Sequence, residues 1–402
     1  MATQVFYNGT LITDSGLLPD GMITACDGRI EYAGPRRDEH IPADAERIDA
    51  GGLYLSPGFV DVHVHGGGGS DFMDATRQDV ETVFHYHAAH GTTALCPTTA
   101  SAPLVEILTA LEVLDQYRRG PQPYGRALGA HIEGPYLTFS KRGCHLAEQV
   151  RAPEEREWRL ILECGMVASM TLAPELPGAR PLIETLYDCG VTASAGHSEA
   201  LYHEMEEAAD WGVTHVTHLY CAMTDAMNNR WRGTPNPRSG GMLEAVFLDD
   251  RLSSELISDG KHLPAEMMRV AFRHKGYEKL AIVTDAMRAA GMPDGEYTFG
   301  PRHGMRTVVR NGESRVPDGT ALASSVCPMN EMVRIARDLI GCPLWQAVRM
   351  ASLTPATIIG RQAAIGSLAP GKFADVLVVD GDVQVRATYL GGVRLKPPRP
   401  TD

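Results

Sequence analysis

Basic side chains are in short supply in this chain. Its 402 residues include 37 lysines and arginines against 50 aspartates and glutamates, which gives a formal net charge of −13. Nucleic acids and anionic membranes are bound through broad basic surfaces, so the composition argues against both as partners. A small anionic substrate is still compatible with it, provided that arginines gather locally.

Long apolar runs, paired cysteines and a leader pattern are also missing. No stretch approaches the roughly 20 apolar residues that a membrane-spanning helix needs. The eight cysteines form no CxxC pair, and the N-terminus shows no basic segment followed by an apolar one. These absences predict a soluble protein in a reducing, cytoplasmic setting. A Gly-x-Ser-x-Gly elbow is missing as well, which argues against a serine hydrolase.

The middle of the chain alternates short β-rich runs with helical patterns. Helical patterns at residues 104–117, 156–163 and 201–211 fall between some of the runs. Eight such units predict an α/β fold of the (β/α)8 TIM-barrel type. The eight strand candidates are 58–65, 91–99, 127–133, 166–174, 191–197, 213–218, 254–259 and 280–285.

The two ends of the chain have a different texture, with short strands separated by glycine-rich turns. We expect them to pair into one small β-sandwich domain. The predicted division is residues 1–56 with 360–402 for this domain, and 57–359 for the barrel.

Polar residues gather where the strand candidates end. In a closed barrel the carboxyl ends of all strands surround one mouth, where catalytic groups sit. Scattered core histidines have no reason to favour one end of successive strands, so the pattern indicates a site. The residues concerned are His63, His65, His131, Glu133, His197, His218 and Asp285.

The first strand carries Asp61, His63 and His65 at alternate positions, so all three share one face. Two histidines two apart on a strand can hold one metal ion. Four glycines at 66–69 follow and allow close backbone approach to a ligand, but no Gly-Lys-Ser/Thr makes them a P-loop.

Glu133 is the predicted carboxylate ligand. Many binuclear hydrolases bridge their ions with a carboxylated lysine, but no lysine ends the fourth strand candidate. The carboxylate must then come from Asp or Glu, and Glu133 ends the third strand beside His131. The alternative is a surface or helix-capping acid.

Histidines ending the fifth and sixth strands complete a three-ligand site. His215 and His218 lie three apart and should point to opposite faces, so we expect His218 to be the ligand and His215 to face the helices. With Glu133 and His197, His218 gives a typical zinc site with an open position. The histidines in helical patterns are interpreted as packing or solvent residues: His85, His87, His90 and His203.

Asp285 closes the last strand candidate, where it could hold a metal-bound water and move its proton. The alternative is a helix N-cap, a position that also suits aspartate.

Taken together, these motifs resemble the amidohydrolase superfamily and, within it, the N-acetylglucosamine-6-phosphate deacetylases. The resemblance covers nearly the whole chain. Its motifs are Pro57-Gly-Phe-Val-Asp-Val-His-Val-His-Gly, His131-Ile-Glu-Gly-Pro-Tyr, Lys141-Arg-Gly-Cys-His, Gly196-His-Ser, Thr217-His-Leu-Tyr-Cys-Ala-Met, Ser258-Asp-Gly-Lys-His, Val283-Thr-Asp-Ala-Met and Ala351-Ser-Leu-Thr-Pro-Ala.

The resemblance implies a principal metal ion on Glu133, His197 and His218, and room for a second on His63 and His65. It also implies one or two divalent ions, with zinc first and iron, cobalt or manganese also accepted by such ligands. A homodimer is expected on the same ground. The residues expected to meet the substrate are His145, His262 and the backbone of Cys221 and Ala222.

The chain departs from the family where the substrate's phosphate is expected. Cys221 stands where the family usually has asparagine, so a side-chain amide is gone. The loop that follows is longer and carries Arg230, Arg232 and Arg238, each able to meet a phosphate through a bidentate pair. The alternative is that these arginines are solvated and that the substrate has no phosphate.

The predicted reaction is hydrolysis of N-acetylglucosamine 6-phosphate to acetate and the amino sugar phosphate, with Asp285 moving the proton and His145 helping to stabilise the oxyanion. Two alternatives stay open. One is an amidohydrolase for another N-acyl amino sugar, either the galactosamine epimer or an unphosphorylated one, or for a cyclic amide or a deamination. The other is a sugar-phosphate sensor without activity.

Overall fold

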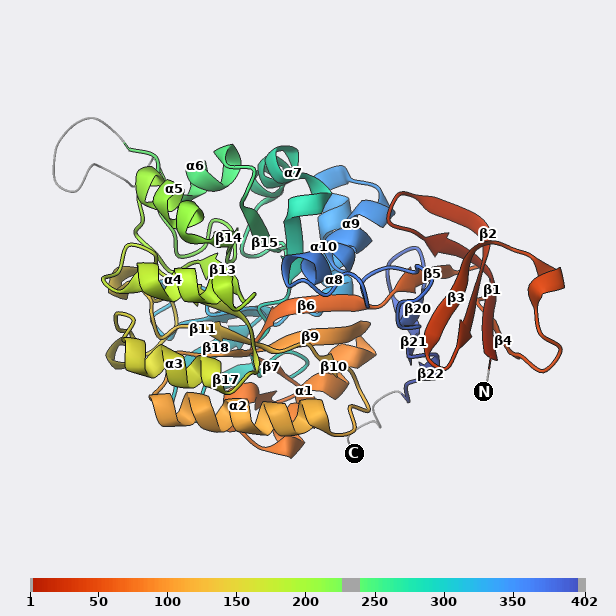
Figure 1. The fold of residues 1–402 in the computed structure, drawn as a ribbon, viewed down its shortest axis with the longest axis horizontal. Coiled ribbons are helices and arrows are strands. Elements are labelled where there is room, and N and C mark those ends of the chain that lie inside the picture. The colour runs from red at the N-terminus through yellow and green to blue at the C-terminus, as the bar shows by residue number, and fades with distance from the viewer. Residues whose placement is uncertain (1–2, 226–238, 397–402) are drawn as a thin grey trace.

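A nearly closed barrel of eight parallel strands occupies the middle of the chain (Figure 1). The computed structural model describes residues 3–225 and 239–396. All eight strand candidates are confirmed within a few residues at each end. They are β6 (Phe59–Val64), β9 (Thr92–Thr99), β11 (Ala130–Glu133), β12 (Val167–Leu172), β13 (Thr192–Ala195), β14 (Val213–Val216), β15 (Ser253–Ile257) and β16 (Leu280–Val283).

Hydrogen bonds bring the last strand segment back to the first. β6 pairs with β9, and parallel pairing then runs through β11 to β16 in chain order. The backbone N–H of Asp285 donates to the His63 carbonyl at 2.9 Å, and the N–H of His65 donates to the Ala286 carbonyl at 2.9 Å. His63, His65 and Asp285, far apart in sequence, are therefore neighbours. The short β10 (Arg126–Ala127) extends the pairing on β9.

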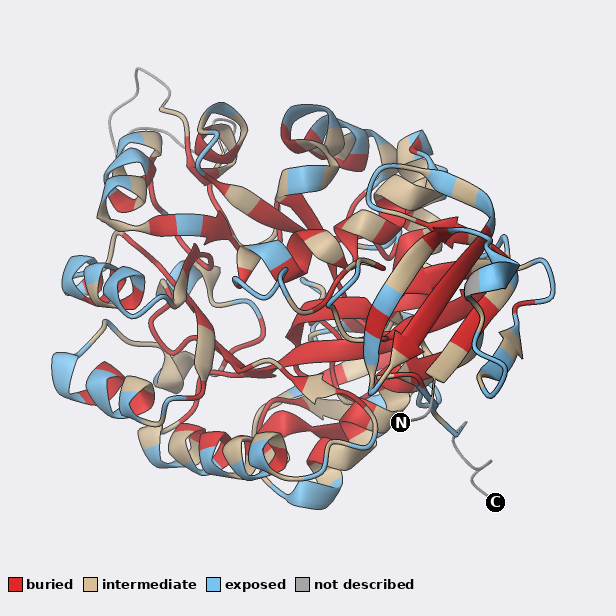
Figure 2. Cartoon of the chain, turned by 45° about the vertical axis from the view of Figure 1, so that its right-hand side comes forward, coloured by how far each residue is buried: buried red, intermediate tan, exposed pale blue. Residues whose placement is uncertain are grey.

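Helices cover the outside of the barrel, with their buried sides facing it and their exposed sides facing solvent (Figure 2). The three predicted helices are confirmed as α2 (Leu104–Arg119), α3 (Glu155–Glu163) and α5 (Tyr202–Trp211). The helices are α1 (Arg77–Ala89), α2 (Leu104–Arg119), α3 (Glu155–Glu163), α4 (Ala179–Asp188), α5 (Tyr202–Trp211), α6 (Met242–Leu248), α7 (Ala265–Lys279), α8 (Met329–Ala336), α9 (Leu344–Met350) and α10 (Leu353–Ile358).

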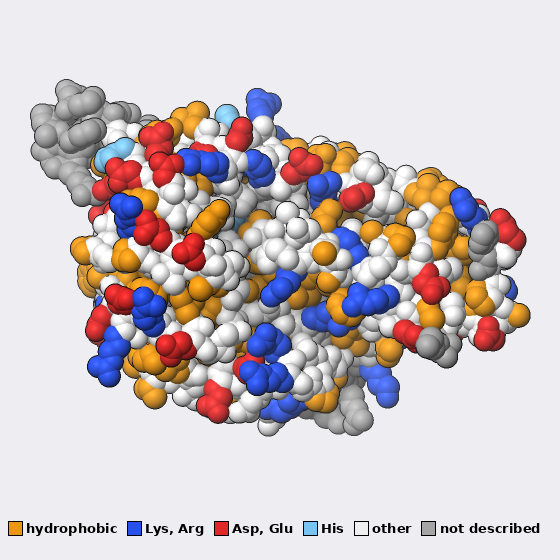
Figure 3. Space-filling view, in the orientation of Figure 1, with side chains coloured by type: hydrophobic (Ala, Val, Ile, Leu, Met, Phe, Trp, Pro, Cys, Tyr) orange, Lys and Arg blue, Asp and Glu red, His pale blue; other side chains and the backbone are white. Residues whose placement is uncertain are grey.

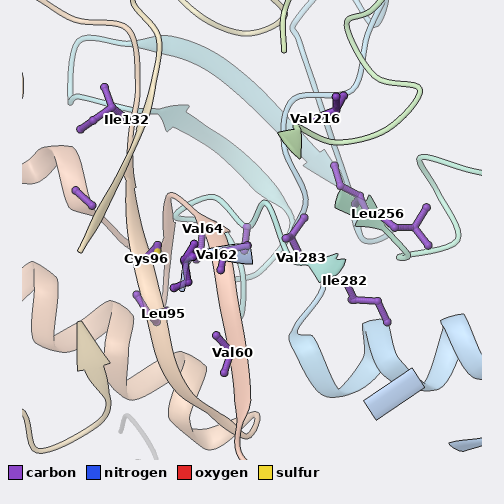
Figure 4. Close-up of a cluster of buried hydrophobic side chains, with 14 of the residues drawn as sticks. Val60, Val62, Val64, Leu95, Cys96, Ile132, Val216, Leu256, Ile282 and Val283 are labelled. Atoms are coloured by element: carbon purple, nitrogen blue, oxygen red, sulfur yellow. The ribbon is translucent and has the colours of Figure 1, made fainter. Parts of the chain in front are cut away.

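Strand β6 shows how one sequence serves both the core and the site. Val60, Val62 and Val64 belong to a cluster of buried side chains that also draws on β9, β15 and β16 (Figure 4). Burying a valine contributes roughly 1.5–3 kcal/mol. Because side chains alternate along a strand, Asp61 and His63 point the other way. The apolar positions thus fix the orientation of the polar ones.

The two chain ends form a separate sheet domain, visible as the extension on the right of Figures 1 and 3. β5 (Tyr54–Pro57) pairs antiparallel with β20 (Val376–Val379), which confirms that the ends meet, and a second apolar core fills the domain. Its strands are β1 (Thr3–Ile12), β2 (Leu17–Cys26), β3 (Arg29–Pro35), β4 (Glu46–Asp49), β5 (Tyr54–Pro57), β20 (Val376–Val379), β21 (Val385–Leu390) and β22 (Val393–Arg394). The boundaries at 56/57 and 359/360 stay a prediction.

A small three-stranded antiparallel sheet follows β16 and was not predicted. It consists of β17 (Gly295–Phe299), β18 (Met305–Arg310) and β19 (Glu313–Arg315), and a two-stranded piece, β7 (Gly66–Gly67) with β8 (Ser70–Asp71), follows β6. The small sheet brings Phe299 to the barrel mouth, where its ring lies 4.7 Å from that of His65. Among the described helices, none is long and apolar enough to cross a membrane.

Candidate metal centre and active site

Glu133, His197 and His218 form one group of potential metal ligands at the carboxyl ends of β11, β13 and β14. The Glu133 Oε1 atom lies 3.2 Å from His197 Nε2 and 3.3 Å from His218 Nε2. The two Nε2 atoms are 2.9 Å apart. All three residues are buried. The structure thus brings together the three residues predicted to hold the principal ion.

The ring of His197 is oriented by the main chain. Its Nδ1 lies 2.6 Å from the carbonyl oxygen of Lys141, which can only accept a hydrogen bond. The proton is therefore on Nδ1, and the Nε2 lone pair points toward Glu133 and His218. This is the tautomer that a metal ligand needs.

His63, His65 and Glu133 form a second group, so Glu133 belongs to both. His65 Nε2 lies 3.1 Å from Glu133 Oε2, and His63 Nε2 lies 3.4 Å from Glu133 Oε1. Both histidines are completely buried. The second predicted group is therefore assembled next to the first, below it in the barrel.

The donor atoms of both groups fit a divalent cation. Imidazole nitrogens of His197 and His218 face one another at 2.9 Å, and those of His63 and His65 do so at 3.3 Å. Two lone pairs at such distances repel each other unless a proton or a metal ion lies between them. Imidazole and carboxylate ligands suit zinc and its neighbours in the first transition row.

Asp285 lies beside the second group and also lines the pocket. Its Oδ1 lies 3.5 Å from His63 Nε2 and 3.4 Å from His65 Nε2, and it accepts a hydrogen bond from the Ser324 hydroxyl at 3.2 Å. No helix of the described residues begins at Asp285, so the N-cap alternative is wrong. Its backbone φ of 45°, like the 50° of His197 and the 26° of His218, is in the left-handed region. Such strain outside glycine is concentrated at functional sites.

His145 reaches the same centre from the loop after β11. The backbone N–H of Ser101 donates to His145 Nδ1 at 3.1 Å, so the ring proton is on Nε2. That Nε2 lies 3.3 Å from Glu133 Oε2. Burial lowers the pKa of His145 to about 4, so the ring is neutral near pH 7 and offers one N–H to the pocket.

Glu133 and Asp285 both have lowered pKa values although they are buried. Burial alone would raise the pKa of Glu133, but the positive character of the surrounding histidine rings, His63 foremost, outweighs it and holds that pKa well below its usual range. The pKa of Asp285 is also lowered, because His63 and His65 outweigh its burial. Both carboxylates are therefore ionised at neutral pH, buried and in need of positive charge.

A cavity of about 340 Å³ opens above the first group. Its walls include Glu133, His197, His218, Asp285 and His145. The predicted substrate contacts Cys221, Ala222 and His262 also line it, and the Asp259 carboxylate holds the His262 ring at 2.7 Å. Most predicted site residues thus surround one space of the size that a small ligand occupies.

Only some of the residues predicted to meet the phosphate belong to the part of the chain that the structure describes. Arg230, Arg232 and Arg238 lie outside the described residues. Lys141, which was not predicted to meet the substrate, is the one Lys or Arg among the described residues that line the cavity. Its Nζ donates to the Met223 carbonyl at 3.0 Å, directly after Cys221 and Ala222.

One expectation about the strand histidines is wrong, and one acid was missed. His215 does not face the helices: its Nε2 lies 3.4 Å from Glu255, whose carboxylate also meets His63. The His215 ring points into the barrel. The expectation failed because His218 lies beyond the end of β14, so strand alternation does not relate the two residues. The sequence offered only a weak signal for Glu255, an acid in the middle of the strand Ser253–Ile257. Phe299 and Ser324 gave no such signal.

The chain is similar to known proteins over nearly all of its length. The model of the amidohydrolase family matches residues 54–395. An N-acetylgalactosamine-6-phosphate deacetylase of Escherichia coli O157:H7 is 34% identical over 97% of this chain and 98% of the relative. An N-acetylglucosamine-6-phosphate deacetylase of Vibrio furnissii is 34% identical over 93% of this chain and 88% of the relative.

A solved structure agrees with these relatives. It is a mutant N-acetyl-D-glucosamine-6-phosphate deacetylase of Mycobacterium smegmatis in complex with N-acetyl-D-glucosamine-6-phosphate. It is 32% identical to this chain, with a TM-score of 0.88, and the match covers 98% of this chain and all of that one. The shared barrel, the second sheet domain and the family match lead to one conclusion: the chain belongs to the amidohydrolase family.

Proposed function

We propose that this protein is a metal-dependent deacetylase that hydrolyses N-acetylglucosamine 6-phosphate to glucosamine 6-phosphate and acetate. The observation that carries the proposal is the group Glu133, His197 and His218 on the floor of a cavity that Asp285 and His145 also line. The names of similar proteins, among them one solved with this sugar phosphate bound, support the substrate.

Glu133, His197 and His218 would hold the principal ion, and His63 and His65 with Glu133 a second one. Zinc is the proposed metal, with iron, cobalt and manganese as alternatives for the same ligands. Such an ion supplies positive charge that polarises the acetamide carbonyl and makes a water molecule more acidic.

Asp285 is the proposed proton carrier. Its ionised carboxylate accepts the proton of the attacking water and then returns it to the departing amine. The contact from Ser324 fixes Oδ1, and the left-handed backbone at Asp285 aims the carboxylate at the centre. The sugar leaves as a neutral amine because this proton is returned.

His145 is the proposed partner of the oxyanion. Its Nε2–H faces the centre because Ser101 occupies Nδ1, and its depressed pKa keeps the ring neutral. A neutral donor adds a hydrogen bond where negative charge develops without repelling the nearby cation.

The phosphate end would lie over the turn at Cys221 and Ala222, with His262 beside it. Lys141 supports this placement, because its ammonium sits at the end of that turn and carries the positive charge that a phosphate needs. Arg230, Arg232 and Arg238 keep their predicted role as additional phosphate contacts.

A second candidate is the same reaction on the galactosamine epimer. The E. coli relative with that name favours it, because the match covers almost the whole of both chains. Cys221 in place of the usual asparagine is consistent with an altered sugar site.

Acetate release from four compounds tests these candidates: N-acetylglucosamine 6-phosphate, its galactosamine epimer, and the two unphosphorylated sugars. We expect the highest kcat/KM for the phosphorylated glucosamine derivative. A higher value for the epimer would favour the second candidate. Equal values with and without phosphate would contradict the phosphate site, and binding without acetate release from any compound would indicate a sensor.

The protein's setting is part of the proposal. All eight cysteines are unpaired, which supports a reducing, cytoplasmic compartment. A homodimer is proposed from the family resemblance, and sedimentation of the purified protein tests it.

A further inference from the structure

We propose that Glu255 is a positioning residue that holds both ion sites in place through a single buried carboxylate. The proposal rests on the ion sites proposed above and adds to them a residue that touches neither substrate nor ion. Glu255 lies in β15 with its side chain 3% exposed.

One contact of Glu255 prepares the second ion site. Its Oε2 lies 2.8 Å from His63 Nδ1, and a carboxylate can only accept here. The His63 proton is therefore on Nδ1, and the Nε2 lone pair is aimed at Glu133 and His65. A carboxylate behind a ligating histidine fixes its tautomer and ring orientation, and removing such a partner typically costs 10–100-fold in metal affinity.

Another contact of the same oxygen prepares the principal site. The backbone N–H of His218 donates to Glu255 Oε2 at 3.0 Å, and the N–H of Leu219 donates to the Glu255 carbonyl at 2.9 Å. His218 has a φ of 26°, a conformation that a non-glycine residue keeps only when its surroundings hold it. Among the described residues, none is a hydrogen-bond partner of His218 Nδ1, so the hold on the His218 backbone replaces a hold on its side chain.

The two ion sites are therefore coupled through Glu255 as well as through Glu133. His215 adds to the hold on Glu255, with its Nε2 at 3.4 Å from Oε1 and its Nδ1 at 2.8 Å from the Ser253 hydroxyl. Since Glu255 lies below the ligands and away from the cavity, its replacement changes the ion sites without removing a ligand.

The test is a Co²⁺ titration of metal-free Glu255→Gln against a competing chromophoric chelator. Glutamine keeps the size and an acceptor oxygen but removes the negative charge that strengthens the hydrogen bonds from His63 and from the His218 N–H. We expect Co²⁺ affinity at both sites to fall by about 10–100-fold, with a changed visible absorption of the bound ion. Glu255→Asp, which keeps the charge on a shorter arm, should also weaken binding and serves if the glutamine variant does not fold.

Two further variants make the result specific. Glu157→Gln removes another buried carboxylate, which lies in the first turn of α3 and pairs with Arg151. This variant should leave Co²⁺ affinity unchanged. In a His63→Asn background, which lacks the second ion, Glu255→Gln should weaken binding of the remaining principal ion.

Unchanged Co²⁺ affinity and spectrum in a folded Glu255→Gln variant would overturn the role of Glu255 while leaving the proposed function intact. A wild-type protein that binds no Co²⁺ would overturn both. Binding of a single Co²⁺ by the wild-type protein would overturn the coupling.

Discussion

The two ligand groups share Glu133 but differ in what surrounds them. His197 and His218 line the cavity, whereas His63 and His65 are completely buried beneath them. Under the proposed function, an ion on the first group would meet the substrate directly, while an ion on the second would act on it only through Glu133 and Asp285. Similar ligand chemistry would thus serve the reaction at the first group and support it at the second.

The difference follows from position along the strands. His63 is inside β6, where packing on both sides closes it in, but His197 and His218 come after β13 and β14 end. Chain beyond a strand end is free to turn, and both residues do so with positive φ. His197 and His218 therefore reach the cavity only with a strained backbone.

Asp285→Asn should give the largest effect, because Asp285 lines the cavity and is the proposed proton carrier. The amide cannot take a proton from water, so kcat for acetate release should fall by about 10²–10⁴-fold. Metal content, measured by elemental analysis, should match the wild type because no predicted ligand is lost. Appreciable activity in this variant would remove Asp285 from its role.

Lowering the pH tests how far the group of His63 and His65 depends on the exclusion of water around it. His87 Nε2 donates to the carbonyl of Gly66, which follows His65, and burial lowers the pKa of His87 to about 4. The unfolded chain, with a histidine pKa near 6.5, binds this proton first, so stability falls as the pH drops from about 6.5 toward 4.

Between pH 7 and pH 5 this residue alone should cost about 2 kcal/mol of unfolding free energy. Urea unfolding of metal-free protein at the two pH values measures the loss, and His87→Gln should lose less by that amount. An equal loss in both proteins would contradict the assignment.

His65→Asn should separate the two groups. One ion per chain should be lost while the principal ion stays, and kcat should fall by only about tenfold, equivalent to roughly 1.4 kcal/mol. His197→Asn is the matched comparison and should lose activity together with the principal ion. Equal losses in the two variants would mean that the groups act as one.

Lys141→Met should give the smallest effect, since Lys141 is partly exposed at the rim. KM for the phosphorylated sugar should rise by about five- to tenfold, equivalent to roughly 1–1.4 kcal/mol for one solvent-exposed hydrogen bond, with little change for the unphosphorylated sugar. Arg142→Met is a suitable control, because Arg142 stacks on the exposed Phe139 ring. A uniform rise for both sugars would show that Lys141 does not recognise phosphate.

Much of the barrel and its centre could be predicted because they rest on local patterns. Short β-rich runs located the eight barrel strands, and residues such as Glu133 and His218 stand at strand ends, where parallel topology brings them together. The pairing of the chain ends was also predictable from their turn-rich texture.

The rest depends on contacts between distant segments. Glu255 looks like an ordinary strand acid until β15 is placed beside β14 and opposite β6. Phe299 reaches the mouth through a small sheet whose position no periodicity reveals. The inward ring of His215 was missed because strand alternation was extended past the end of β14.

The most direct test of the account is restoration of activity in a metal-stripped protein. Zn²⁺ is added back stepwise to the wild type and to a His63→Asn/His65→Asn variant while acetate release from N-acetylglucosamine 6-phosphate is followed. We predict no activity before addition and recovery in both proteins, with the variant needing one ion per chain. Activity without metal, or a variant that binds its ion and stays inactive, would contradict the claim that Glu133, His197 and His218 hold the ion of the reaction.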